Sequence, residues 1–444
     1  MEAEKTVYKV HVLLFPSFGH GHINPMIQLS KLLAFKGLKV TIAALLSTVN
    51  SVAEETETET DSSIKFVSIF DDCDPENGLK GPGGFKGFST RFESMAMKNL
   101  TKLITQFQES NDPVKCLFYD ANLPQALDVA KEIGIFTAAF FTQSCAAIAS
   151  YYPMQYDVKL SLPAFSMPGL PEIRLPNLPS FGSSTTNHSP ILIHIFKQFS
   201  NLGNADWVLF NSFDKLEEQV LKWMLNIWPV RAIGPSISSA DLYKSSSSGE
   251  AKEDCIKWLD TREPASVVYV AFGSNASLSS NQMIEMANAL KQCNKSFLWV
   301  VKSNEETGLP LDFINKTSQK GMVVNWCPQL KVLAHKAVGC FVTHCGWNST
   351  LEAITFGIPM VAMPQFLDQI TNAYFVEEKW GIGVQPLVDD NHVSSCNEIV
   401  RCIREVSSGE IHRNALAWKA SAKEAFQENG SSNKHMDDII RFIS

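Results

Sequence analysis

Residues 326–369 constrain the fold more than any other stretch of the chain. Within them, residues 339–343 (GCFVT) are a short apolar run typical of a buried parallel strand, and the HCGWN sequence that follows predicts a turn. A helix is expected next, capped by Asn348 or Ser349, with Glu352 three residues after Ser349 as in a capping box. Strand, turn and capped helix in this order indicate an α/β fold.

The start of this expected helix also predicts an anion site. A helix N-terminus just after a strand presents unpaired backbone N–H groups and the positive end of the helix dipole. His344, Trp347, Asn348 and Ser349 lie at this point and would face a bound phosphate. The pattern alone leaves a plain structural role open, because every doubly wound fold repeats the same unit.

The rest of the chain alternates strands and helices. An apolar strand at residues 10–15 is followed by the loop PSFGHGHINP and by a helix from about Asn24 to Phe35, a βαβ unit whose loop lies at the ligand-binding edge of the sheet. Further strands are expected at residues 38–44, 116–120, 136–142, 207–213, 230–235, 266–274 and 297–301. The order predicts doubly wound parallel sheets.

Length and linker composition indicate two domains. A chain of 444 residues is too long for one hydrophobic core. Its hydrophobic fraction of 45% is enough to form the cores of two domains. The Ser-rich segment 236–250 predicts a linker between a first domain, residues 1–235, and a second domain, residues 251–430. Residues 431–444 predict an amphipathic terminal helix.

Composition argues against several partners. A net charge of −8 and a pI near 5.7 disfavour nucleic acid and anionic membranes. The 10 cysteines show no C-x-x-C spacing, so neither a zinc site nor a disulfide framework is indicated. The opening MEAEKTVYKVHVLLFP is acidic where a signal peptide is basic, and its apolar run is too short for a membrane span. We expect a cytoplasmic protein with no metal.

Residues 326–369 are similar, nearly residue for residue, to the signature box of plant family-1 UDP-glycosyltransferases, and the resemblance covers essentially the whole chain. It implies the GT-B fold of two Rossmann-like domains, with the acceptor on the first domain, the UDP-sugar on the second, and the terminal helix returning to the first. A monomer is expected. A nicotinamide oxidoreductase is disfavoured, because neither half begins with G-x-G-x-x-G.

The resemblance also implies which residues bind the donor. It assigns the uracil to Trp326 and the backbone of Cys327, the ribose to Gln329 and Glu352, the pyrophosphate to Ser274, His344, Asn348, Ser349 and the backbone of Trp347, and the sugar to Thr142, Asp368 and Gln369. The chemistry agrees, because aromatics stack on bases, carboxylates bind vicinal hydroxyls and helix ends bind phosphate. No cofactor is implied beyond UDP-glucose as co-substrate.

Transfer of a sugar to a hydroxyl needs a base, and histidine is the natural one near neutral pH. The resemblance assigns this role to His22, directly before the I-N-P sequence, with Asp120 behind it to fix its tautomer. From position alone, a His could cap a helix and an Asp could belong to a turn. The family has one His in this loop, whereas here His20 and His22 flank Gly21, and we interpret His20 as a neighbour of the acceptor pocket.

The implied reaction is an inverting glucosyl transfer that yields a β-glucoside. Gln369 favours UDP-glucose over UDP-galactose, because relatives preferring galactose tend to carry His there, while an amide both donates and accepts. Intact His22 and Asp120 argue against the alternative of a nucleotide-sugar-binding protein without turnover.

The acceptor is predicted from the expected pocket wall. The turn-rich segments 77–89 and 162–181 are expected to be irregular and to line the pocket. The wall would include Phe18, Phe85, Phe88, Leu123, Phe181, Phe366 and Leu367. These side chains favour a small-molecule acceptor with a large apolar scaffold, such as a terpenoid or steroid, over a small charged acid. Lys86 and Arg91 leave a carboxylic acid open, and phenolics are also glucosylated in the subgroup that the chain resembles.

Overall fold

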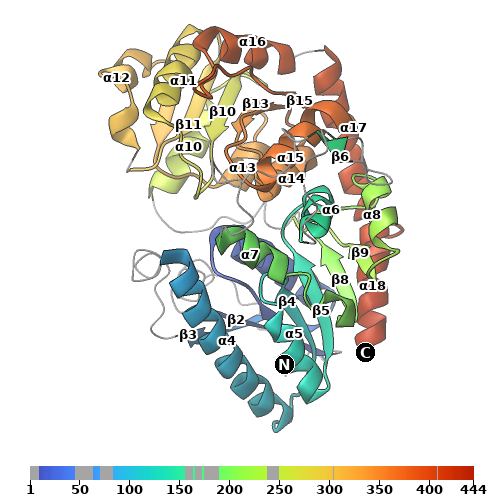
Figure 1. Ribbon diagram of the computed structural model, residues 1–444. Coiled ribbons are helices and arrows are strands. Elements are labelled where there is room, and N and C mark those ends of the chain that lie inside the picture. Colours follow the sequence, from blue (N-terminus) through green and yellow to red (C-terminus); the bar gives the residue numbers. More distant parts are fainter. Residues whose placement is uncertain are drawn as a thin grey trace, which may run out of the picture.

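The computed structural model describes residues 10–45, 64–70, 84–155, 164–165, 173–174, 190–237, 250–303, 305–407 and 409–444. Two parallel sheets, each packed against helices, form two domains that lie one above the other in Figure 1, the N-terminal half below and the C-terminal half above. This architecture confirms the predicted fold class of two Rossmann-like α/β domains.

The first sheet has the strand order β3-β2-β1-β4-β5-β8-β9, and every pairing in it is parallel. Its strands are β1 (His11–Phe15), β2 (Lys39–Leu45), β3 (Ile64–Phe70), β4 (Val114–Asp120), β5 (Phe136–Phe141), β8 (Trp207–Phe210) and β9 (Val230–Ala232). Its helices are α1 (His20–Phe35), α4 (Gly84–Gln108), α5 (Gln125–Ile133), α6 (Cys145–Met154), α7 (Pro190–Lys197), η2 (Leu202–Asn204) and α8 (Glu218–Met224).

The second sheet has the order β12-β11-β10-β13-β14-β15, again parallel throughout. Its strands are β10 (Val267–Ala271), β11 (Ser296–Val300), β12 (Gly321–Val324), β13 (Val338–Thr343), β14 (Met360–Ala362) and β15 (Gly383–Val384). The other elements are α10 (Glu250–Asp260), α11 (Ser280–Gln292), η3 (Glu306–Gly308), α12 (Phe313–Thr317), α13 (Gln329–Ala334), α14 (Trp347–Phe356), α15 (Asp368–Tyr374), the π-helical turn η4 (Phe375–Lys379), α16 (Cys396–Val406), α17 (Gly409–Ala425) and α18 (Ser431–Ile443).

The strand order reverses once in each sheet, between β1 and β4 and between β10 and β13. Loops that leave the carboxyl ends of the two strands flanking such a point diverge to opposite faces and leave a ligand-binding crevice between them. The candidate residues after β1, β4, β10 and β13 therefore lie where this fold binds ligands.

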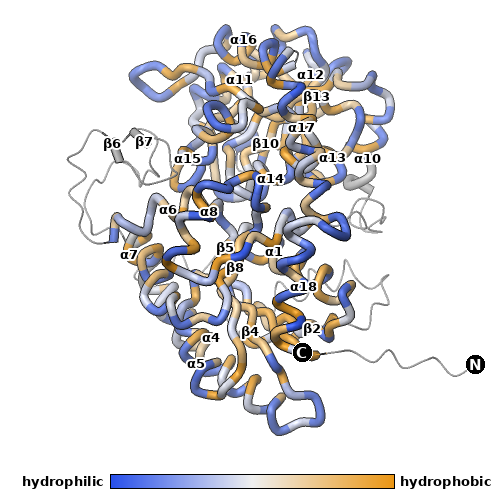
Figure 2. Tube along the Cα trace, turned by 90° about the vertical axis from the view of Figure 1, so that its right-hand side faces the viewer, coloured by the Kyte–Doolittle hydropathy of each residue, from blue (hydrophilic) through white to orange (hydrophobic). Residues whose placement is uncertain are grey.

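The strands are apolar runs because helices cover both sheet faces. All five residues of β1 and all six of β13 are buried, and the central strands are mostly orange in Figure 2 while the outer loops are mostly blue.

Two tryptophan side chains of the second domain donate hydrogen bonds to the first domain. Trp347 Nε1 donates to the Asn211 carbonyl at 2.8 Å, and Trp380 Nε1 donates to the Leu216 carbonyl at 3.1 Å. These buried bonds fix how the domains meet.

Helix α18 closes the chain against the first domain. Met436, Ile439 and Ile440 pack into the core formed by β1 and β2. Ser432 Oγ donates to the Gly234 carbonyl at 2.6 Å, and Lys36, directly after α1, pairs with Asp437 at 2.6 Å. Of the helices in the described ranges, none is long and apolar enough to cross a membrane.

Three predicted segments differ from the structure. Helix α1 begins at His20 instead of Asn24, because Gly19 adopts φ +96° and turns the chain directly into the helix. Residues 84–89 belong to α4 and are not irregular. Within the proline-rich segment, β6 (Ala164–Phe165) pairs antiparallel with β7 (Ile173–Arg174). Residues 1–9, 77–83, most of 162–181 and 238–249 of the expected linker lie outside the described residues.

Candidate active site

The structure brings His22 and Asp120 together where β1 and β4 part. His22 lies in the first turn of α1, Asp120 is the last residue of β4, and His22 Nδ1 is 2.8 Å from Asp120 Oδ2. The other carboxylate oxygen accepts from the backbone N–H of Asn122 at 2.9 Å. Since an ionised carboxylate can only accept, Nδ1 carries the proton and Nε2 keeps a lone pair. This is the arrangement of a histidine general base.

Two carboxylates adjust the basicity of this imidazole. Burial alone would lower the pKa of His22, but Asp120, through its charge and its hydrogen bond, and Asp368 of the second domain together raise that pKa above its ordinary value. The influence of Asp368 also shows that residues from both domains meet at this point. His20, by contrast, is exposed at the first residue of α1.

Two further polar side chains contact the His22 ring. Thr142, expected to touch the sugar, follows β5 and places its hydroxyl 3.1 Å from His22 Nδ1. Asn122 places its amide nitrogen 3.1 Å from Nε2. Asn122 was not predicted as a site residue, although it lies two residues after a candidate catalytic Asp at a strand end.

The second half of the site begins at the end of β13, where the His344 ring lies between two glycines. A Cβ on Gly273 would lie 2.8 Å from the ring, and one on Gly346 would lie 2.5 Å from Nε2. Gly273 also adopts φ +68°, which favours glycine. Burial, with a smaller contribution from Lys302, lowers the pKa of His344 to about 4, so the ring is a neutral hydrogen-bonding group.

The capping prediction for α14 is wrong. The helix begins at Trp347, with Gly346 at the cap position, and no described side chain caps it. Ser349 Oγ instead accepts from Gln329 Nε2 at 2.9 Å, and the Asn348 amide donates to the Gly21 carbonyl at 3.0 Å. The first-turn N–H groups are therefore not used by a side-chain cap, which is the arrangement an anion needs.

The bond from Asn348 to Gly21 has a local cause. Pro25 lies inside α1 and has no N–H, so the carbonyl four residues earlier, that of Gly21, loses its helical partner. Asn348 of the second domain supplies the missing donor. The turn that carries His22 is thereby tied to the turn that carries the predicted phosphate-binding residues.

The expected uracil and ribose residues surround the start of α13. The Trp326 side chain is 54% exposed, whereas Cys327 is buried beside Tyr269. Gln329 Nε2 donates to Glu352 Oε2 at 2.7 Å, and burial raises the pKa of Glu352 to about 7 despite that bond. The structure therefore combines an accessible indole with a paired amide and carboxyl group.

Asp368 and Gln369, which are also expected to bind the sugar, lie at the start of α15, after Leu367, which adopts φ +55°. Burial raises the pKa of Asp368 to about 6, although the hydrogen bond from Asn372 at 2.9 Å acts to lower that pKa. Gln369 is buried, and its carbonyl oxygen accepts from the backbone N–H groups of Gln365 at 2.9 Å and Phe366 at 3.2 Å.

Asn372 and Lys302 were not predicted from the sequence. The Asn372 amide donates to Asp368 and to the Cys345 carbonyl at 3.0 Å, while its oxygen accepts from Ser144 of the first domain at 2.7 Å. Lys302 binds the Ser274 loop through three of its oxygens, including the Ser274 carbonyl at 3.3 Å. Ser274 itself is exposed beside Gly273. Asn372 and Lys302 therefore hold loops that carry predicted site residues.

The residues predicted to line the acceptor pocket differ in their burial. Phe18 meets Phe88 edge-on, with ring centroids 5.0 Å apart, and meets Phe92 in the same way at 5.1 Å. Leu123 and Phe88 are both buried in the core, so neither side chain is accessible to an acceptor in this structure. Phe366 and Leu367 are half-buried beside Asp368, and Arg91 is exposed. The side chains of Phe85 and Lys86, and residue Phe181, lie outside what the structure describes.

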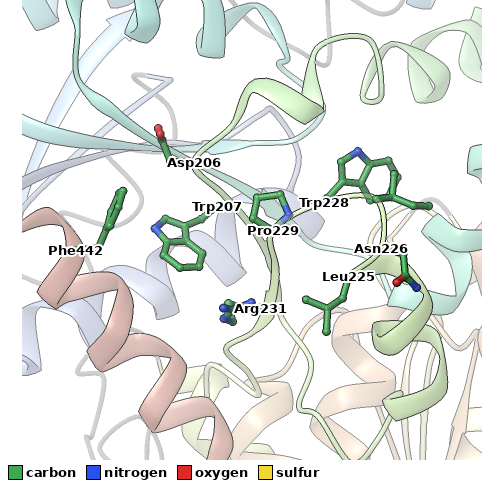
Figure 3. Close-up of a pocket in the computed structure, with 9 residues that line it drawn as sticks. Asp206, Trp207, Leu225, Asn226, Trp228, Pro229, Arg231 and Phe442 are labelled. Carbon is green, nitrogen blue, oxygen red and sulfur yellow. The ribbon is translucent and has the colours of Figure 1, made fainter.

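An open groove at the opposite end of the first sheet is separate from this site (Figure 3). Trp207 is the first residue of β8, whereas Asp120 is the last of the parallel strand β4. The Arg231 guanidinium lies 5.1 Å from the Trp207 ring, and Phe442 of α18 meets that ring edge-on at 5.6 Å. The groove therefore borders the seam where α18 packs on the sheet.

Two Rossmann-like domains that meet at their ligand-binding edges, one with a His–Asp pair and one with an uncapped helix N-terminus and an accessible indole, define a GT-B glycosyltransferase. The family model described as "UDP-glucoronosyl and UDP-glucosyl transferase" matches residues 245–418. The chain is 42% identical to "UDP-glucosyl transferase 74CD1" of Saponaria officinalis, over 98% of each chain. It is 38% identical to "Mogroside I-E synthase" of Siraitia grosvenorii, also over 98% of each.

Solved structures agree with these relatives. Os79 of O. sativa in complex with UDP matches with a TM-score of 0.85 and 34% identity, over 98% of this chain and 100% of that one. The same rice protein has also been solved with UDP and deoxynivalenol-3-glucoside. The chain belongs to the plant family-1 UDP-glycosyltransferases, as its resemblance implied.

Proposed function

We propose that the protein transfers glucose from UDP-glucose to a hydroxyl group of an apolar plant metabolite, with inversion at the anomeric carbon, and that a terpenoid or steroid is the preferred acceptor. The observation that carries this proposal is the His22–Asp120 pair, whose basicity is raised by Asp368 of the opposite domain. A base and a predicted sugar-binding carboxylate meet at one point, as direct transfer between bound substrates requires.

The reaction is a single displacement. His22 Nε2 takes the proton of the acceptor hydroxyl as its oxygen attacks C1 of the glucose. The new C1–O bond forms as the bond from C1 to the diphosphate oxygen breaks, and the electron pair leaves with UDP. Asp120 holds the Nδ1 proton in place and stabilises the imidazolium that forms. Attack opposite to an α-linked diphosphate gives a β-glucoside.

The second domain binds and stabilises the leaving UDP. Trp326 stacks on the uracil, and Gln329 with Glu352 holds the ribose. The first turn of α14, with His344, Asn348, Ser349 and the Trp347 backbone, binds the diphosphate.

The positive end of α14 takes the place of a metal cation at the diphosphate. Asp368 and Gln369 bind the glucose hydroxyls, with Asn372 orienting Asp368. The donor is thereby held by side chains and helix ends of one domain.

The acceptor preference has two supports. Phe18 is half-buried on the acceptor domain, packs edge-on against the buried Phe88 and Phe92, and offers an apolar surface to an acceptor. "Mogroside I-E synthase" is among the similar relatives, and the rice Os79 structures include a complex with a trichothecene. These names suggest bulky apolar acceptors.

The test is a rate measurement with UDP-glucose and four acceptors: a steroid, a triterpene, a flavonoid and a benzoic acid. We expect UDP release with all productive acceptors and the highest kcat/KM for the steroid or triterpene. A clear preference for the benzoic acid would overturn the acceptor assignment. UDP binding without turnover on any acceptor would instead favour a nucleotide-sugar-binding protein.

A further inference from the structure

Asn122 is a buried amide with one hydrogen-bonding neighbour. Its side chain is 8% exposed, and within the described residues the amide has no hydrogen-bond partner other than the His22 ring. Its oxygen, Oδ1, is buried and unpaired there. Burial of an amide that makes so few bonds costs stability, so this residue calls for a role other than packing.

The two distances from the amide nitrogen define its place on the ring. Nδ2 of Asn122 lies 3.1 Å from His22 Nε2 and 3.4 Å from Nδ1. An atom on the axis of the Nε2 lone pair would lie far beyond hydrogen-bond distance from Nδ1. The near-equal distances therefore place the amide against the face of the imidazole, as in an N–H···π contact. The Nε2 lone pair stays open to the acceptor hydroxyl.

The groups around the ring differ in which protonation state of His22 they favour. Asp120 lies at the Nδ1 edge, Asp368 acts from the second domain, and Thr142 is the neutral neighbour beside Nδ1. Both carboxylates favour the protonated ring. The positive end of the Asn122 amide dipole has the opposite preference, because a donor attracts a neutral ring and repels an imidazolium. The reversed amide would turn Oδ1 toward the electron-rich ring face.

We propose that Asn122 is a positioning residue of the glucosyl transfer, whose amide lies against His22 and holds the imidazole in its neutral, proton-accepting form. This inference rests on the proposed function of His22 as the base. Without Asn122, the two carboxylates would keep more of the base protonated at neutral pH. The amide thereby offsets the acidic surroundings that the donor-sugar site imposes on the base.

The test compares Asn122→Leu and Asn122→Asp with the unmodified protein. NMR titration of His22, assigned with a His22→Gln variant, measures the pKa without any turnover. We expect the pKa of His22 to rise by roughly half a pH unit in Asn122→Leu, the size of a lost N–H···π contact. It should rise by about one unit or more in Asn122→Asp, which adds a carboxylate beside the ring. The acid limb of the kcat/KM profile should shift in the same order.

Two further measurements separate this role from a structural one. Asn201 is the matched control: its amide donates to the Pro124 carbonyl and to Asp128, and its oxygen is also buried and unpaired among the described residues, but it does not touch His22. Asn201→Leu should leave the pKa of His22 unchanged. Asn122→Leu should unfold at the same temperature as the parent or higher, because it removes a poorly paired amide.

An unchanged pKa of His22 in both Asn122 variants would overturn the proposal, as would equal shifts in Asn201→Leu. If the protein transferred no glucose at all, the proposed function would fail, while the NMR titration would still decide whether Asn122 acts on His22. The failures of the two proposals are therefore distinguishable.

Discussion

Replacing His22 by Ala removes the imidazole that contacts Asp120 at the carboxyl edge of the first sheet. A positioned general base contributes roughly 10²–10⁴-fold to rate, so kcat with UDP-glucose and a reactive acceptor should fall by that factor. At about 1.4 kcal/mol for each factor of ten, this is roughly 3–5 kcal/mol of transition-state stabilisation. The affinity for UDP should stay unchanged, because the predicted UDP-binding residues lie on the second domain.

His20→Ala is the matched control for this variant. His20 is only two residues away in the same helical turn, but it is exposed. Its loss should leave kcat nearly unchanged and alter at most the KM for the acceptor. The assay is UDP release under saturating donor, with UDP affinity measured by calorimetry. An inactive His20→Ala together with an active His22→Ala would refute the assignment.

The pH dependence tests the same base independently. The base acts in its neutral form, so kcat/KM should fall as the pH drops through the pKa of His22, which Asp120 and Asp368 raise above its ordinary value. Asp120→Asn removes one of the charges that raise this pKa, so the acid limb should move to lower pH while the plateau rate falls. An acid limb that stays in place or moves upward would contradict this electrostatic account.

Three other predictions concern the donor. Trp326→Ala should weaken UDP binding by about 1–3 kcal/mol, the range for base–aromatic stacking, as measured by calorimetry. Asn372→Ala should weaken UDP-glucose more than UDP, because Asp368 loses its orienting bond, whereas Ser144→Ala should spare this difference since it keeps that bond. Asp368 has a pKa raised to about 6, so the carboxylate form that accepts from sugar hydroxyls is present above that pH. The preference for UDP-glucose over UDP should therefore decline as the pH falls below about 6, and Asp368→Asn should abolish this dependence.

Most of the architecture could be predicted because buried parallel strands are written as continuous apolar runs. The strand before the HCGWN turn and the strand ending at Asp120 end at the predicted residues and begin one and two residues earlier than predicted. Once the strands follow each other in βαβ order, the residues after them fall at the ligand-binding edge. The proximity of His22 and Asp120 follows from that topology.

The hydrogen-bond partners of individual polar residues could not be predicted in this way. Serine is a common helix-capping residue, but the Ser349 hydroxyl accepts a hydrogen bond from the Gln329 side chain instead. The position of Gln329 depends on how α13 packs on α14. Asn122 and Asn372 gain their roles only from contacts across elements far apart in sequence. Local propensity describes what a side chain can bond to, whereas the fold decides which partner lies within reach.

The start of α1 shows how such a contact can connect the two halves of the site. The sequence places a proline inside the helix, which local rules treat as a defect because the carbonyl of Gly21 is left without its helical donor. The Asn348 amide supplies that donor from the opposite domain, at the predicted diphosphate-binding turn. The carbonyl that Pro25 leaves without a helical donor thus joins the turn that carries His22 to the turn predicted to bind the diphosphate. Because the bond requires the two turns to lie within hydrogen-bond distance, it constrains the position of His22 relative to the turn predicted to bind the diphosphate.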